Sequence, residues 1–176
     1  AIAASNASLT GVNEAVGLTG GAGNNQIATS ETFRVTASPS VVASANADGD
    51  AIISGDGTAE ATAAANSVNA VGMQLGDGNN SITTSGVFMV TARPEAEAES
   101  ASDADGAGWF FTNPDSRATT VANADGAVAI GIQTGEGNNT IINDGSFAVT
   151  AAPTITFANA YAHYGADILG IDSFAN

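Results

Sequence analysis

GEGNNTIINDGSFAVTAAP, residues 135–153, decides the fold because the chain contains this stretch three times in slightly different forms. Residues 76–94 read GDGNNSITTSGVFMVTARP, and residues 21–39 read GAGNNQIATSETFRVTASP. The three copies share G-x-G-N-N-x-I and then, at a fixed distance, F-x-V-T-A-x-P. A catalytic site is built once, whereas a motif that recurs at a long spacing is typical of a repeat architecture.

Charge and composition exclude several classes of protein. Eighteen Asp and Glu residues face only three positive side chains, all arginine, so the net charge is −15. An extended negative field repels nucleic acid and anionic membrane surfaces. The chain has no cysteine, which excludes disulfides and thiolate chemistry. It also lacks an apolar run of the roughly 20 residues that a membrane-spanning helix needs. It begins at Ala1, so we expect a mature secreted form or an excised segment.

Each copy of the motif predicts a Gly-rich corner, a short strand, a second turn and a longer strand. In the longer strand, Phe, Val and Ala alternate with more variable residues, and a period of two places them on one face. The side chains expected to fill the core are Ile27, Phe33, Val35, Ile82, Phe88, Val90, Ile141, Phe147 and Val149. The residues expected to build the corners are Gly23, Asn24, Asn25, Gly78, Asn79, Asn80, Gly137, Asn138 and Asn139.

The segments between the copies alternate Ala with small or polar residues. A helix would need apolar residues three and four positions apart, so this alternation predicts strands. The weakest case is EAEAESASDA, because Ala and Glu favour helices. These segments are 43–52, 60–73, 95–108, 118–132 and 157–171. We therefore expect residues 1–176 to form one β-repeat domain.

The spacing of the copies suggests the size of the repeating unit. The Gly-Asn-Asn corners begin at Gly23, Gly78 and Gly137. Each interval divides into three turns of roughly 18 to 20 residues, the size of one coil in a small parallel β-solenoid. This division predicts a parallel β-solenoid of about nine coils. The alternative is an antiparallel β-sandwich, which the same short alternating strands could build.

The corner motif resembles two related classes of bacterial secreted repeat. The first is the haemolysin-type calcium-binding repeat, G-G-x-G-x-D-x-hydrophobic-x, whose pattern Gly76, Gly78 and Ile82 match. The family's calcium-ligating Asp falls here on Asn80 and on its equivalents Asn25 and Asn139, which removes a negative ligand in each copy. The second class is the autotransporter-like surface β-helix proteins, to whose coils residues 134–151 are similar. These resemblances imply a parallel β-helix that serves as a surface adhesin, fibre or scaffold.

Acidic residues in the turns are the candidate metal ligands. Calcium takes six to eight oxygen ligands, which carboxylates and turn carbonyls supply. The alternative is that these carboxylates are solvated and keep an Ala-rich surface soluble. The candidates are Asp48, Asp50, Asp56, Asp77, Asp103, Asp105, Asp125 and Glu136. No cofactor is expected to be required, and calcium is the only candidate.

The sequence offers little for catalysis. Lysine is absent, and Arg34, Arg93 and Arg117 lie far apart in the chain. The single histidine, His163, lies on an alternating segment between two tyrosines, where a packed or surface role is the expected one. We therefore do not expect an enzyme.

The two ends of the sequence suggest association between copies. Both resemble the element that precedes a Gly-Asn-Asn corner, and neither shows the polar cap that normally closes a solenoid. This predicts head-to-tail stacking or strand exchange into a filament or surface layer, outside the cell of a microbe. A calcium-stabilised cell-surface adhesin that binds a glycan or another surface ligand is the alternative. The aromatic residues proposed as subunit contacts are Trp109, Phe110, Phe111, Tyr161, Tyr164 and Phe174.

Overall fold

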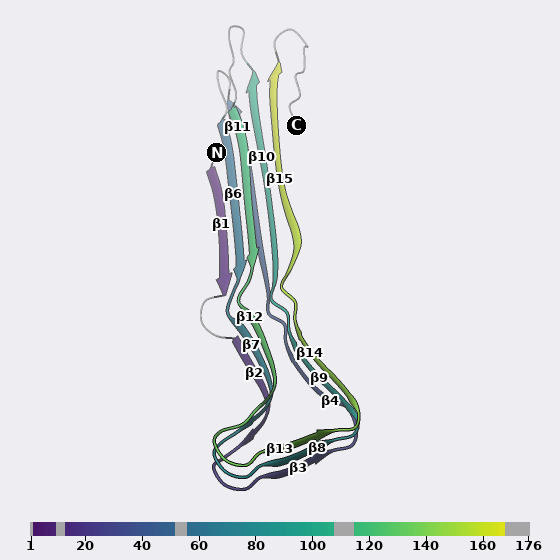
Figure 1. Cartoon of the computed structure of the whole chain (residues 1–176). Helices are drawn as coiled ribbons and strands as arrows, with labels where there is room; N and C mark the ends of the chain where they lie inside the picture. The colour runs from purple at the N-terminus through teal and green to yellow at the C-terminus, as the bar shows by residue number, and fades with distance from the viewer. Residues whose placement is uncertain (1, 10–12, 52–55, 108–114, 168–176) are drawn as a thin grey trace.

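The computed structural model describes residues 2–9, 13–51, 56–107 and 115–167, and within these ranges the chain is all β, with no helix (Figure 1). None of these residues therefore belongs to a helix that could cross a membrane. The strands follow one another in three runs of five, which we call coils 1, 2 and 3. Coil 1 contains β1 (Ile2–Leu9), β2 (Asn13–Gly20), β3 (Gln26–Thr29), β4 (Phe33–Ala37) and β5 (Ser40–Ala51). Coil 2 contains β6 (Asp56–Ala65), β7 (Val68–Leu75), β8 (Ser81–Thr84), β9 (Val87–Ala92) and β10 (Glu95–Ala107). Coil 3 contains β11 (Asp115–Ala124), β12 (Ala127–Gln133), β13 (Thr140–Asn143), β14 (Ser146–Ala151) and β15 (Thr154–Asp167).

Strands that occupy the same position in successive coils pair side by side. The described strands form five parallel sheets, ordered β1-β6-β11, β2-β7-β12, β3-β8-β13, β4-β9-β14 and β5-β10-β15. This arrangement is a β-solenoid-like repeat, and the antiparallel sandwich considered above is wrong. Among the described strands, every partner lies between 55 and 60 residues away. Coils of 18 to 20 residues are therefore also wrong, because the unit that stacks is the whole interval between two corners.

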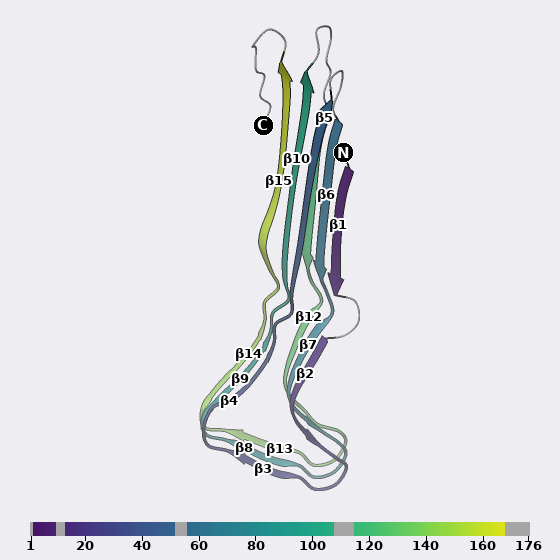
Figure 2. The same cartoon turned by 180° about the vertical axis from the view of Figure 1, so that it is seen from behind.

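Each coil has an asymmetric outline. Figures 1 and 2 show a long straight part, the arm, in which the sheet of β1, β6 and β11 faces the sheet of β5, β10 and β15. The other three sheets form a bent, closed end, which we call the foot. The Gly-Asn-Asn corners lie in the foot, between β2 and β3 and at the equivalent places in coils 2 and 3.

Small side chains fill the arm. Ala59, Ala61, Ala63 and Ala65 of β6 are fully buried, and they pack in one cluster with the inward-facing alanines of β5 and β10. The outward positions between them carry Glu60, Thr62 and Ala64. In β10 the same alternation buries Ala96 and Ala98, but farther along the strand the buried positions are Ser100 and Ser102. Gly57 shows how closely the two sheets approach, because an added Cβ would lie 2.8 Å from the Ser102 Oγ. The arm is therefore a thin double sheet.

A column of aromatic rings fills the foot. Phe33, Phe88 and Phe147 stack with centroid distances of 4.9 and 4.7 Å and interplanar angles of 12° and 4°. Facing this column is a column of glycines, Gly17, Gly72 and Gly131, whose Cβ positions would lie within 2.7 Å of the Phe Cζ atoms. The rings can occupy the foot because the facing strand has no side chain at that position.

Register also corrects the assignment of the last element. β15 pairs with β10, so residues 154–167 follow the Phe-Val-Ala strand rather than precede a Gly-Asn-Asn corner, as the sequence suggested. The bulge between Ala96 and Glu97 adjusts this pairing. The four additional residues of the second interval lie between Gly106 and Asp115, since Gly106 pairs with Ala51 and Asp115 with Asp56.

Candidate functional site

The Gly-Asn-Asn corner makes its turn with a backbone that glycine accepts most easily. Gly23, Gly78 and Gly137 have φ values of 120°, 134° and 123°. Most residues with a Cβ avoid this region, whereas glycine enters it without penalty. The N–H of Gly23 donates to Asp77 O, and that of Gly78 donates to Glu136 O, both at 2.7 Å. The three corners thus stack directly on one another.

The second Asn of each corner forms an internal amide ladder. Asn25 Nδ2 donates to Asn80 Oδ1 at 2.7 Å, and Asn80 Nδ2 donates to Asn139 Oδ1 at the same distance. Each of these amides also donates to glycine carbonyls of its own turn, such as Asn80 Nδ2 to Gly76 O at 3.2 Å. Asn80 is only 1 % exposed, so its polar groups depend on these partners.

The first Asn of each corner forms a second ladder at the surface. The backbone N–H of Asn79 donates to Asn24 Oδ1, and that of Asn138 donates to Asn79 Oδ1, each at 3.0 Å. Both ladders have a direction. In the inner ladder the side-chain donor lies in the earlier coil, and in the outer ladder the backbone donor lies in the later coil.

A directional ladder leaves different groups at its two ends. Within the described residues, no neighbouring coil supplies a donor to Asn138 Oδ1 or an acceptor for a further ladder bond from Asn139 Nδ2. At the other end, no described coil lies before coil 1 to supply Asn25 Oδ1 and the Asn24 N–H with the partners that their equivalents in coil 2 have. Each group open on coil 3 is therefore the complement of a group open on coil 1.

Burial shows that the face of coil 3 is open as well as polar. Phe88 is 1 % exposed, whereas Phe147 in the next coil is 42 % exposed. Val149 and Ile141 are 40 % and 50 % exposed, although their equivalents in coil 2 are fully buried. These three residues, which the sequence led us to expect in a core, lie on an open face because no strand of the described chain lies beyond coil 3. The core side chains of coil 1 are better covered, as Val35 shows at 7 %.

The acidic residues are distributed over several parts of the molecule. Asp48 pairs in register with Asp103 on the outer face of the arm, and Asp77 Oδ1 accepts the N–H of Glu136 at 2.8 Å in the corner. Asp56 begins β6, and Asp125 lies between β11 and β12. Within the described part of the chain, no three acidic or histidine side chains gather as a metal would require. Asp50 and Asp105 pair in register on β5 and β10, but their side chains lie outside the described residues.

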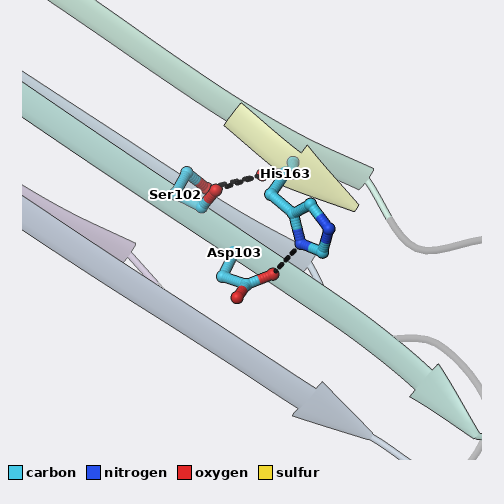
Figure 3. A network of polar contacts seen from close by, with 4 residues as sticks. Ser102, Asp103 and His163 are labelled. Carbon is cyan, nitrogen blue, oxygen red and sulfur yellow. Dashed lines mark hydrogen bonds and ion pairs between the residues drawn. The ribbon is translucent and has the colours of Figure 1, made fainter. Parts of the chain in front are cut away.

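His163 of β15 lies within hydrogen-bonding distance of Asp103 of β10. Figure 3 shows the two side chains pointing toward each other, with His163 Nδ1 at 2.9 Å from Asp103 Oδ1. The neighbouring Ser102 is buried on the opposite face of β10 and accepts a hydrogen bond from Ser116 Oγ at 3.0 Å. Because successive residues of a strand point to opposite faces, Ser102 does not join the other two in a relay. The pair links two strands of the arm.

Of the aromatic residues proposed as subunit contacts, the structure describes only part. Tyr161 is 51 % exposed on β15, close in sequence to the 42 % exposed Phe157. Tyr164 lies on the same strand, but its side chain is outside the described residues. Trp109, Phe110, Phe111 and Phe174 also lie outside them.

Sequence reasoning missed the glycine column and the open face of coil 3. The glycines had a readable signal, since AVGLTG, AVGMQL and AIGIQT place Gly17, Gly72 and Gly131 at the same distance before each corner. No signal in the sequence predicted the open face, because a repeated motif does not show which copy lacks a neighbour.

No family model, no curated protein and no solved structure matches this chain.

Proposed function

We propose that this chain is a structural extracellular protein, the subunit of a filament or surface layer in which one copy stacks on the next through the ends of its solenoid. The observation that carries the proposal is the open face of coil 3. Phe147, Val149 and Ile141 are half exposed there, in positions where the same residue types in coil 2 are completely buried.

Hydrophobic burial favours covering this face. Removing the side chain of a Val, Ile or Phe from water contributes roughly 1.5–3 kcal/mol, so the exposed halves of these three contribute on the order of 1 kcal/mol each. The strand edges of coil 3 add backbone groups that a further parallel strand would satisfy, and such edges are templates for association. Both effects act together only if a whole coil docks.

The assignment to the outside of a cell rests on composition and resemblance. The chain has no cysteine, which fits a secreted protein that does not rely on disulfides. Its net charge of −15 keeps the sides of a fibre soluble and opposes lateral association between fibres. The corner motif resembles those of bacterial surface β-helix repeats, which serve mostly as adhesins, fibres and scaffolds. A self-stacking scaffold unites these features without requiring a ligand.

Negative-stain electron microscopy of the purified chain, with calcium and separately with EDTA, tests the proposal. We expect uniform filaments or sheets under both conditions. Filaments that form only with calcium would keep the structural role and make some of the acidic turns metal sites. Compact single particles under both conditions would contradict the proposal and favour a monomeric adhesin.

A further inference from the structure

We infer that the junction between copies has one polarity and one register: coil 3 of one copy stacks on coil 1 of the next, and continues the columns that run through the molecule. This inference rests on the proposed function. It adds which surfaces meet and which residues pair, with Phe147 placed on Phe33 and Asn139 on Asn25 of the second copy.

The hydrogen-bonding groups of the two faces are complementary only when coil 3 of one copy meets coil 1 of the next. Asn139 Nδ2 would donate to Asn25 Oδ1 of the second copy, as Asn80 Nδ2 donates to Asn139 Oδ1 within the chain. The backbone N–H of Asn24 in that copy would donate to Asn138 Oδ1, as the Asn138 N–H donates to Asn79 Oδ1. A contact between two coil 3 faces would instead place donor against donor at Asn139 and acceptor against acceptor at Asn138.

The backbone groups at the edges of coil 1 and coil 3 are complementary in the same orientation. Ser81 N–H donates to Asn25 O and Thr140 N–H donates to Asn80 O, both at 2.8 Å. Gln26 occupies the same register position in coil 1. Its N–H therefore faces away from coil 2, toward the place where Asn139 O of another copy would lie.

The outline of the coil favours the same orientation. The arm is long and straight, and the foot bends away from it (Figure 1). A second copy placed in the same orientation superposes its arm and foot on those of the first. A copy turned over to present its coil 3 face would carry a reversed outline, so that arm and foot could not both be covered.

Two variants block one face each. Gln26→Pro removes an N–H that faces away from coil 2, and leaves the bonds between coils 1 and 2 in place. Gln26→Ala is its control, because it keeps the N–H. Val149→Glu puts a carboxylate on the coil 3 face at a position that is 40 % exposed, so the charge can reach water in the monomer but not in a junction. Its control is Thr150→Glu, which adds the same charge on the outer face of the same strand.

Sedimentation velocity of each variant alone and of a one-to-one mixture decides the polarity. We expect Gln26→Pro and Val149→Glu to be monomers when alone, and to form a dimer and nothing larger when mixed. Both controls should assemble like the unmodified chain. Circular dichroism confirms that each variant is folded, and Ile141→Glu, at a 50 % exposed position, replaces Val149→Glu if that variant is not.

Three results would overturn the inference. A dimer of Gln26→Pro alone would mean that coil 3 faces meet each other, and a dimer of Val149→Glu alone would mean the same for coil 1 faces. A mixture that stays monomeric while the unmodified chain assembles would place the junction elsewhere. All three results would contradict this inference but not the proposed self-assembly. An unmodified chain that stays monomeric would contradict both the proposed function and this inference.

Discussion

Gly72 is a position where a single methyl group decides whether two coils can stack. An added Cβ would lie 2.6 Å from Phe88 Cζ and 2.8 Å from Val90 Cγ2, and it would press on the carbonyl oxygen of Gly131 in the next coil. Two of these atoms belong to fully buried side chains and the third to the backbone, so none can move without disturbing its own neighbours. The glycine column is therefore part of the packing of the foot and not merely a source of backbone freedom.

Gly72→Ala should destabilise the chain by about 1–3 kcal/mol or more, which is the usual cost of overpacking a filled core. Gly21→Ala is the matched control, because nothing lies within 4 Å of its Cβ position and its φ is not in the left-handed region. The measurement is urea unfolding of both variants, under conditions in which they are monomeric. Equal midpoints for the two variants would show that the foot is looser than these distances indicate.

At the scale of the element, the strands themselves could be read from the sequence, but their partners could not. Alternation at period two correctly predicted strands in the Ala-rich segments, even in EAEAESASDA, which is part of β10. Alternation does not say which strand lies beside which. Dividing the interval between corners into three short coils gave the wrong size, because stacking requires like columns such as Phe33, Phe88 and Phe147, and these recur only once per interval.

The candidate site was predictable to a similar extent. The repeated Asn residues pointed to a stacked corner, and the amide ladder of Asn25, Asn80 and Asn139 is present. The open face was not predictable, because Phe88 and Phe147 occupy the same motif position and differ only in what lies beyond them. Exposure of 1 % and 42 % at these two positions is a property of the stack and not of the motif.

The two sheets of the arm lie so close together that a larger side chain between them should destabilise the protein. Ala61 of β6 is fully buried against the alanines of the facing sheet, which leaves no room for a larger residue. Ala61→Leu should force the sheets apart or the side chain into a strained conformation, at a cost of about 1–3 kcal/mol or more. Glu60→Leu, on the exposed face of the same strand, is the control and should change stability by about 0.5 kcal/mol or less.

Thermal unfolding followed by circular dichroism compares these two variants. A lower melting temperature for Ala61→Leu alone is the expected result. If instead both variants melt with the unmodified chain, the arm can open to accept a leucine, and the tight approach of the two sheets is not a requirement of the fold.

At the scale of the whole molecule, apolar burial favours assembly, whereas repulsion between negatively charged copies opposes it. Every subunit carries a net charge of −15, so each added copy brings a strongly negative body against another. The contacts that would join them are apolar side chains, amide ladders and backbone edges, none of which salt weakens. Salt therefore acts mainly on the repulsion, whose range falls from about 30 Å at 0.01 M to about 10 Å at 0.1 M ionic strength.

The concentration needed for assembly should therefore fall as sodium chloride is raised from about 0.01 M to about 0.1 M, the range over which this screening length shrinks about threefold. Light scattering against protein concentration at each salt level measures this threshold. Calcium chloride and magnesium chloride at matched ionic strength should lower the threshold equally if screening is the cause. A much larger effect of calcium would instead show that acidic residues bind it specifically, since screening does not distinguish two divalent cations of equal charge. A threshold that rises with sodium chloride would contradict the expected junction, because only contacts held by ion pairs between copies weaken when charges are screened.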